Sequence, residues 1–62
     1  MTIYYLKING ELAGQIAREL SPLEIKLFVA RQELPLSFEG THTRQYWKGL
    51  TEVKEVYYLF RK

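Results

Sequence analysis

The chain contains no cysteine and no aspartate, and His42 is its single histidine. The absence of cysteine excludes a disulfide framework and a thiolate metal site, and it suits a reducing compartment. With one histidine and no aspartate, the chain cannot assemble a metal cluster from the usual ligands or a Ser-His-Asp triad. We therefore expect a protein that is not an enzyme and that needs no cofactor and no metal.

Long apolar runs are also missing. No apolar stretch reaches the roughly 18 residues that a membrane-spanning helix requires. The N-terminus has no basic segment followed by an apolar stretch and a small-residue cleavage site, so no signal peptide is expected. We expect a cytoplasmic protein with no membrane partner. The 62 residues predict a single domain, 1–62, of marginal stability, because so small a chain buries only about 60% of its unfolded surface.

Basic residues slightly outnumber acidic ones, and the formal net charge is +2. This balance permits binding to nucleic acid without requiring it. The excess lies toward the C-terminal end, because from Thr41 onward five Lys or Arg residues and His42 stand against only Glu52 and Glu55. Aromatic side chains make up 15% of the residues and help a small core reach adequate burial.

The clearest local signal is a helix over Ser21–Leu34. Ser21 suits the N-cap, Pro22 suits the first helical position, and Glu24 lies where a capping box requires an acidic residue. The end is set by Pro35, because a residue before proline is driven out of the helical region. At roughly 100° per residue the helix has two apolar faces, one made by Ile25, Phe28 and Val29 and the other by Leu23, Leu27 and Ala30. We expect one face to pack on the core and the other to meet a partner.

The segment before this helix has two interpretations. Thr2–Ile8 is rich in β-branched and aromatic residues and predicts a strand, and Asn9-Gly10 predicts a turn. We prefer a helix over the next segment, ELAGQIAREL, because most of its residues are strong helix formers. The alternative is a β-hairpin in which Glu11–Ala17 returns as a second strand, with Ile3 opposite Ile16 and Tyr5 opposite Gly14.

The C-terminal half predicts a small β-ribbon followed by a helix. Leu36–Glu39 and Thr43–Trp47 predict two short strands joined by a polar turn at 40–42. Leu50–Lys62 has strand propensity in VYYLF, but an apolar stripe at helical spacing favours a helix. The resulting fold class is mainly α with a small β-ribbon (α+β), in the order strand, helix, helix, β-ribbon, helix.

This order resembles the winged helix-turn-helix domains of the MerR-like and phage excisionase-like group. SPLEIKLFVARQELP, with Lys26 and Phe28, is similar to the second helix of that group. GTHTRQYW, with Arg44 and Tyr46, is similar to the wing, and LTEVKEVYYLFRK to the helix that follows it. The resemblance implies an excisionase-like architectural factor or transcription regulator. The helix over 21–34 would enter the major groove of double-stranded DNA, and the ribbon over 38–47 would track the backbone or minor groove.

The candidate DNA-binding residues are basic or polar side chains on these elements. On the ribbon they are His42, Thr43, Arg44 and Lys48, and on the two helices Lys26, Arg31 and Arg18. Tyr46 and Trp47 would stack or pack on sugar, unless they belong to the core and the ribbon tip is only a solvated loop. A metal-independent ribonuclease site made of His42, Arg44 and Tyr46 is a disfavoured third interpretation.

The alternative function is a non-enzymatic protein-binding module, an inhibitor or adaptor. It would dock through the helix face formed by Leu23, Leu27 and Ala30, unless both helix faces are covered within the monomer. For the DNA-binding function we expect self-association or a protein partner such as a recombinase or polymerase, because so small a domain offers limited specificity alone.

Overall fold

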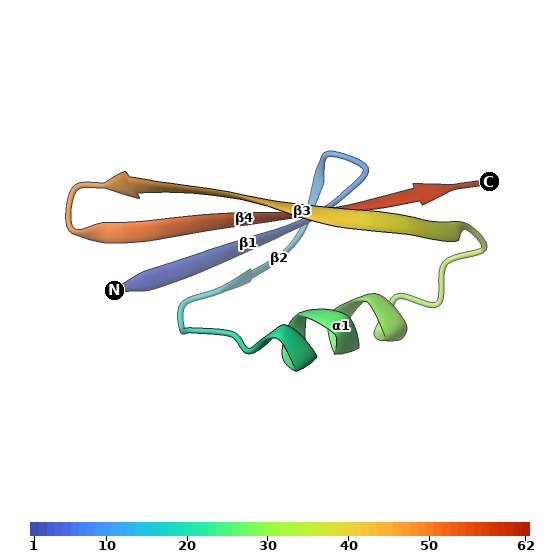
Figure 1. Ribbon diagram of the computed structural model, residues 1–62, viewed down its shortest axis with the longest axis horizontal. Coiled ribbons are helices and arrows are strands. Elements are labelled where there is room, and N and C mark those ends of the chain that lie inside the picture. Colours follow the sequence, from blue (N-terminus) through green and yellow to red (C-terminus); the bar gives the residue numbers. More distant parts are fainter.

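The computed structural model describes all residues, 1–62. Four strands and one helix follow along the chain as β1 (Thr2–Ile8), β2 (Glu11–Ile16), α1 (Pro22–Arg31), β3 (Ser37–Lys48) and β4 (Thr51–Arg61) (Figure 1). The strands form one sheet in the order β2-β1-β4-β3. Each hairpin is antiparallel, whereas β1 and β4 pair in parallel at the centre of the sheet.

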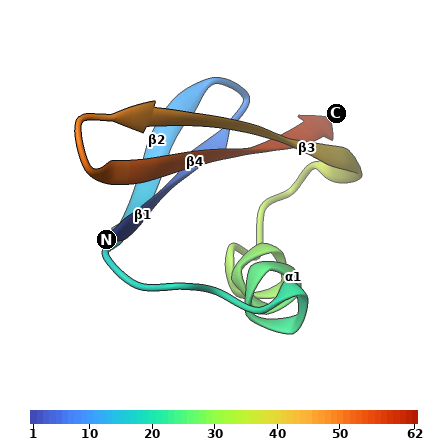
Figure 2. The same cartoon turned by 60° about the vertical axis from the view of Figure 1, so that its left-hand side comes forward.

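The sheet has one covered and one uncovered face. Helix α1 lies on one side of the sheet, and no element lies on the other side (Figures 1 and 2). We call the two sides the helix face and the open face. Because side chains alternate along each strand and directly paired residues share a face, the register places on the open face Ile3, Tyr5, Lys7, Leu12, Gln15, His42, Arg44, Tyr46, Lys48, Val53, Glu55, Tyr57 and Leu59.

The predicted fold class is wrong. Strands account for 58% of the chain and the single helix for 16%, so the protein is mostly β. The order strand, helix, helix, β-ribbon, helix that the resemblance implied is not the order of this chain, and it contains no helix-turn-helix. The strand over Thr2–Ile8 is confirmed as β1. No helix of the structure is long and apolar enough to cross a membrane.

The helix predicted directly after β1 is replaced by the hairpin strand β2. Asn9 and Gly10 have φ values of 49° and 86°, so both adopt the left-handed conformation that a two-residue hairpin turn requires. This turn directs the chain back along β1, and hydrogen bonding to β1 outweighs the helical propensity of the segment. A bulge between Leu6 and Lys7 then shifts the register by one residue, so that Tyr4, and not Ile3, lies opposite Ile16.

The helix predicted over Leu50–Lys62 is also wrong, because this segment is the central strand β4. Its β-branched and aromatic residues fit a strand that is enclosed by neighbours on both edges. Val56 and Tyr58 point to the helix face, whereas Val53 and Glu55 point to the open face. All four are buried. Burial on both faces explains why apolar residues occur at spacings that also suit a helix.

The predicted β-ribbon is one long strand, not two short ones. β3 runs without a turn from Ser37 to Lys48, and residues 41 and 42 of the expected turn pair regularly with β4. The only irregularity of this pairing is a bulge between Phe38 and Gly40, just before the expected turn. The reversal occurs instead just beyond Lys48, at Gly49, whose φ of 63° favours glycine. β3 can continue because it pairs with β4 along nearly its whole length.

Helix α1 begins as predicted but ends early. The hydroxyl Oγ of Ser21 accepts a hydrogen bond from the backbone N–H of Glu24, and the Glu24 carboxylate accepts one from the Ser21 N–H, each at 3.2 Å. This capping box is confirmed. The helix ends at Arg31, not Leu34, because Glu33 takes a left-handed conformation with φ 47°. The helix therefore stops before Pro35 can act on it.

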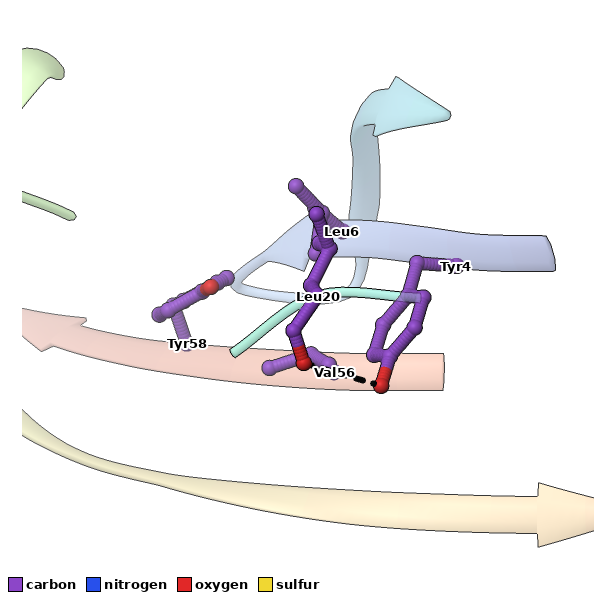
Figure 3. Packing of buried hydrophobic residues seen from close by; sticks show 5 residues of the cluster. All are labelled: Tyr4, Leu6, Leu20, Val56 and Tyr58. Carbon is purple, nitrogen blue, oxygen red and sulfur yellow. Dashed lines mark hydrogen bonds between the residues drawn. The ribbon is translucent and has the colours of Figure 1, made fainter. Parts of the chain in front are cut away.

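The core lies between α1 and the helix face. Its buried members come from β1, β4 and the loop before α1, and they are Tyr4, Leu6, Leu20, Val56 and Tyr58 (Figure 3). The face of α1 formed by Ile25, Phe28 and Val29 packs against them, as predicted. The Phe28 and Tyr58 rings lie 5.2 Å apart, and the Tyr58 hydroxyl donates to the Ile25 carbonyl at 3.1 Å. Burial raises the pKa of Tyr58 to about 12, so its hydroxyl remains a donor.

Candidate functional site

The open face carries a cluster of aromatic and charged side chains outside the core. Three tyrosines, Tyr5, Tyr46 and Tyr57, lie there half-buried, one on each of β1, β3 and β4. Three cationic side chains lie among them, Lys7 of β1 and Arg44 and Lys48 of β3. Because no second layer covers this face, rings and cations remain within reach of a ligand.

Glu55 lies at the centre of this face and is only 7% exposed. Its Oε2 atom pairs with the Lys7 Nζ atom at 2.7 Å, and its Oε1 atom with an Arg44 guanidinium nitrogen at 3.4 Å. The hydrogen bond from Lys7 lowers the pKa of Glu55, and the same bond raises the pKa of Lys7. Glu55 is therefore a fixed anion that joins β1 and β3 across the central strand.

Aromatic rings and cations on the open face are in direct contact. The His42 and Tyr57 rings stack at 4.7 Å with an interplanar angle of 8°. The Lys7 Nζ atom lies 5.3 Å from the centroid of the Tyr57 ring, and the Arg44 guanidinium carbon lies 5.0 Å from the centroid of Tyr46. These distances are within the range of cation–π attraction. The contacts hold the rings in place, and a positive charge lies beside the Tyr57 and Tyr46 rings.

A hollow of about 300 Å³ opens on this face. It is bordered by residues of all four strands, namely Tyr5, Lys7, Leu12, Tyr46, Lys48, Val53 and Glu55. The hollow combines two aromatic rings, two ammonium groups and one carboxylate. Such a mixture suits a ligand that has both a flat ring and negative charge.

The charge of the open face is positive. Lys7, Arg44 and Lys48 stand against the single carboxylate of Glu55, a net of +2 that equals the formal net charge of the whole chain. The six cations elsewhere are balanced by six glutamates. Three of these cations form ion pairs, at 2.6 Å for Arg18–Glu24, 2.9 Å for Lys54–Glu19 and 3.3 Å for Arg61–Glu39. An anionic partner would therefore meet its strongest attraction at the open face.

The predicted DNA-binding residues lie on two surfaces. His42, Arg44 and Lys48 alternate along β3 and come together on the open face, whereas Thr43 lies opposite Val56 on the helix face. The other three are on the α1 side of the molecule. Arg18 pairs with Glu24, and Arg18 and Arg31 both border a hollow of about 220 Å³ between α1 and β2. Lys26 borders a separate hollow of about 290 Å³.

The predicted protein-docking residues of α1 are exposed. Leu23 is 64% exposed, Leu27 is 42% exposed, and Ala30 is also at the surface. The monomer covers only the opposite face of the helix. The helix therefore presents an apolar stripe to solvent. The protein-binding interpretation required this stripe to be exposed and not covered within the monomer.

The sequence interpretation missed four residues of the open face, namely Tyr5, Lys7, Glu55 and Tyr57. Reading Thr51–Arg61 as a strand would have placed Glu55 and Tyr57 on the same side as Val53, because side chains of a strand alternate. Period-two alternation in TIYYLKI would likewise have grouped Tyr5 with Lys7. The alternation of side chains in these two segments groups the four residues, but only if both segments are taken as strands.

Comparisons with family models, with curated proteins and with solved structures found no match for this chain.

Proposed function

We propose that the chain binds single-stranded nucleic acid on the open face of its sheet. The observation that carries the proposal is the alternation of tyrosine rings and cations on a sheet face that nothing covers. Bases of single strands stack on aromatic side chains displayed by such sheets, and Lys and Arg beside the rings attract the phosphates. Tyr5, Tyr46 and Tyr57 supply the rings in this chain, and Arg44 and Lys48 supply exposed cations.

Single strands fit this face better than the double-stranded DNA expected from the sequence. A duplex keeps its bases stacked inside, so the tyrosines would find no free ring faces and only the cations would contribute. The single helix also packs on the sheet through one of its faces, which removes the paired helices from which a major-groove contact was predicted. We expect single strands to bind more tightly than a duplex of the same sequence.

The proposal is tested by titrating a dye-labelled single strand of about ten nucleotides, within the usual site size, at several salt concentrations. We expect binding that weakens as salt rises, by about 0.7 in the logarithmic slope for each phosphate contact. The double variant Arg44→Ala/Lys48→Ala should bind on the order of tenfold more weakly and lose about 1.4 of the slope. A duplex of the same sequence gives the comparison.

The matched control is Lys26→Ala/Arg31→Ala, which removes the same charge from exposed positions of α1. We expect this control to bind nearly as well as the unaltered chain. An equal loss in both double variants would mean that net charge alone is responsible. Absence of binding at low salt would refute the proposal.

A second candidate function is a protein-binding module that docks through the outer face of α1. The observation that favours it is the exposure of Leu23, Leu27 and Ala30. Exposed apolar stripes on amphipathic helices are a common mode of protein recognition. The two functions use opposite sides of the molecule and are separated by different substitutions.

A further inference from the structure

The hollow on the open face has the size and lining of a site for one nucleobase. Its volume of about 300 Å³ is at the lower end of the range for small-ligand sites. Its deepest residues are Val53 and Glu55, which are 3% and 7% exposed. Tyr5 and Tyr46 border it with rings, and Lys48 adds a cation for a neighbouring phosphate.

Glu55 supplies acceptors to this hollow that its protein partners do not use up. A carboxylate has about four lone-pair positions. One donor, Lys7, is at 2.7 Å and the other, Arg44, is at the long distance of 3.4 Å. Because Lys7 lowers the pKa of Glu55, the group is ionised at neutral pH and accepts hydrogen bonds without donating any. A ligand that reaches it must present donors.

Among the bases, guanine matches two such acceptors best. Its Watson–Crick edge presents a ring N–H and an amino group side by side, which a carboxylate accepts in a two-point contact. Adenine and cytosine each present an amino group beside a ring acceptor. Uracil and thymine present one N–H between two carbonyl oxygens, and a carboxylate repels these oxygens. An anionic acceptor at the bottom of the hollow therefore distinguishes guanine from the other bases.

We propose that the hollow around Glu55 is a nucleobase site that selects guanine within a single-stranded segment. This inference rests on the proposed function, since it names the base that the open face prefers. Stacking between Tyr5 and Tyr46 would hold the base, and hydrogen bonds to the Glu55 carboxylate would discriminate guanine from the other bases. Lys7 is the positioning residue that fixes the carboxylate.

The first test uses the unaltered chain and three oligothymidylates of equal length, about ten nucleotides each. One is uniform, one carries a central guanosine, and one carries a central inosine, which lacks only the amino group. We expect the guanosine strand to bind about tenfold more tightly than the uniform strand, the scale of a two-point base contact. The inosine strand should lie between them. Equal affinity for all three strands would overturn the inference while leaving the proposed function intact.

The second test compares Glu55→Gln with Glu52→Gln, the matched change on the same strand. Glu52 lies on the helix face and belongs to no part of the hollow. We expect Glu55→Gln to reduce the preference for guanosine to less than about twofold while the uniform strand still binds. Glu52→Gln should keep the full preference. A preference that survives in Glu55→Gln would contradict the assignment of Glu55. Failure of every strand to bind the unaltered chain at low salt would refute the proposed function itself.

Discussion

At the scale of single residues, Glu55 has the largest structural consequence on the open face. It is nearly buried in the central strand, and its two ion pairs connect the three strands β1, β4 and β3. A buried carboxylate without these partners would be costly, whereas a paired and hydrogen-bonded one is tolerated. The same residue therefore contributes to the stability of the sheet and to the recognition proposed for it.

Glu55 should make stability depend on pH in the acid range. Its pKa is lower in the folded chain than the ordinary value of 4.5, because of Lys7. Its contribution is therefore present above about pH 4.5 and is lost as the pH falls through the lower folded value. At neutral pH we expect Glu55→Gln to lower the free energy of unfolding by about 1 to 2 kcal/mol, a range that allows for the exposure of Lys7 and Arg44.

Urea unfolding of the two proteins between about pH 7 and about pH 3 provides the measurement. The difference between them should shrink in acid, because a protonated Glu55 resembles glutamine. The pKa values of Glu19 and Glu24 are also lowered, by Lys54 and Arg18, but both proteins retain these groups. A difference that stays constant over the whole range would contradict this account of Glu55.

At the scale of elements, the capping box makes α1 a well-defined helix. We expect Ser21→Ala to lower the free energy of unfolding by about 1 kcal/mol, because the Glu24 backbone N–H loses its acceptor. Ser21→Asp should recover most of the loss. Ser37→Ala is the matched control, since Ser37 is exposed at the start of β3. Denaturation midpoints measure all three variants, and equal effects at both serines would exclude a capping role.

Which elements could be predicted depended on how local their signals are. The start of α1 is determined by Ser21, Pro22 and Glu24, three residues within one turn, and it was predicted correctly. β2 could not be assigned from propensity, because the turn at Asn9-Gly10 and pairing with β1 overrule the helix formers that follow. Tertiary context overrides intrinsic propensity in this way throughout proteins.

The candidate site was predicted in part for the same reason. His42, Arg44 and Lys48 were named together because they are close in sequence, and they lie on one face because they alternate along β3. Glu55 and Tyr57 belong to a segment that was expected to be helical, and nothing local reveals that β4 lies between β1 and β3. Their role depends on pairing between residues far apart in the chain.

At the scale of the whole molecule, the single helix covers one face of the sheet and leaves the other face uncovered. Only seven of 62 residues are buried, and a two-layer arrangement leaves both the open face and the outer face of α1 uncovered. An exposed apolar stripe such as the outer face of α1 favours association. The molecule therefore has two separate uncovered surfaces, one on each side.

The outer face of α1 should be tested through the molecular mass in solution. If Leu23, Leu27 and Ala30 bind a second copy, the mass should rise with concentration, and Leu27→Glu should abolish the rise. The matched control is Leu50→Glu, since Leu50 is 92% exposed in the β3–β4 turn and remote from α1. Light scattering coupled to size-exclusion chromatography measures both. A mass that does not vary with concentration in the unaltered chain would exclude self-association through this face.

The parallel pairing of β1 with β4 has a consequence for synthesis. β1 leaves the ribosome before β2, α1 and β3, and β4 follows them, yet β1 and β4 are neighbours at the centre of the sheet. A nascent chain that ends before β4 leaves one edge of β1 without its partner and lacks two of the five buried core residues, Val56 and Tyr58. Such unpaired edges invite contacts with other chains. The sheet can therefore be completed only after the residues through Arg61 have left the ribosome.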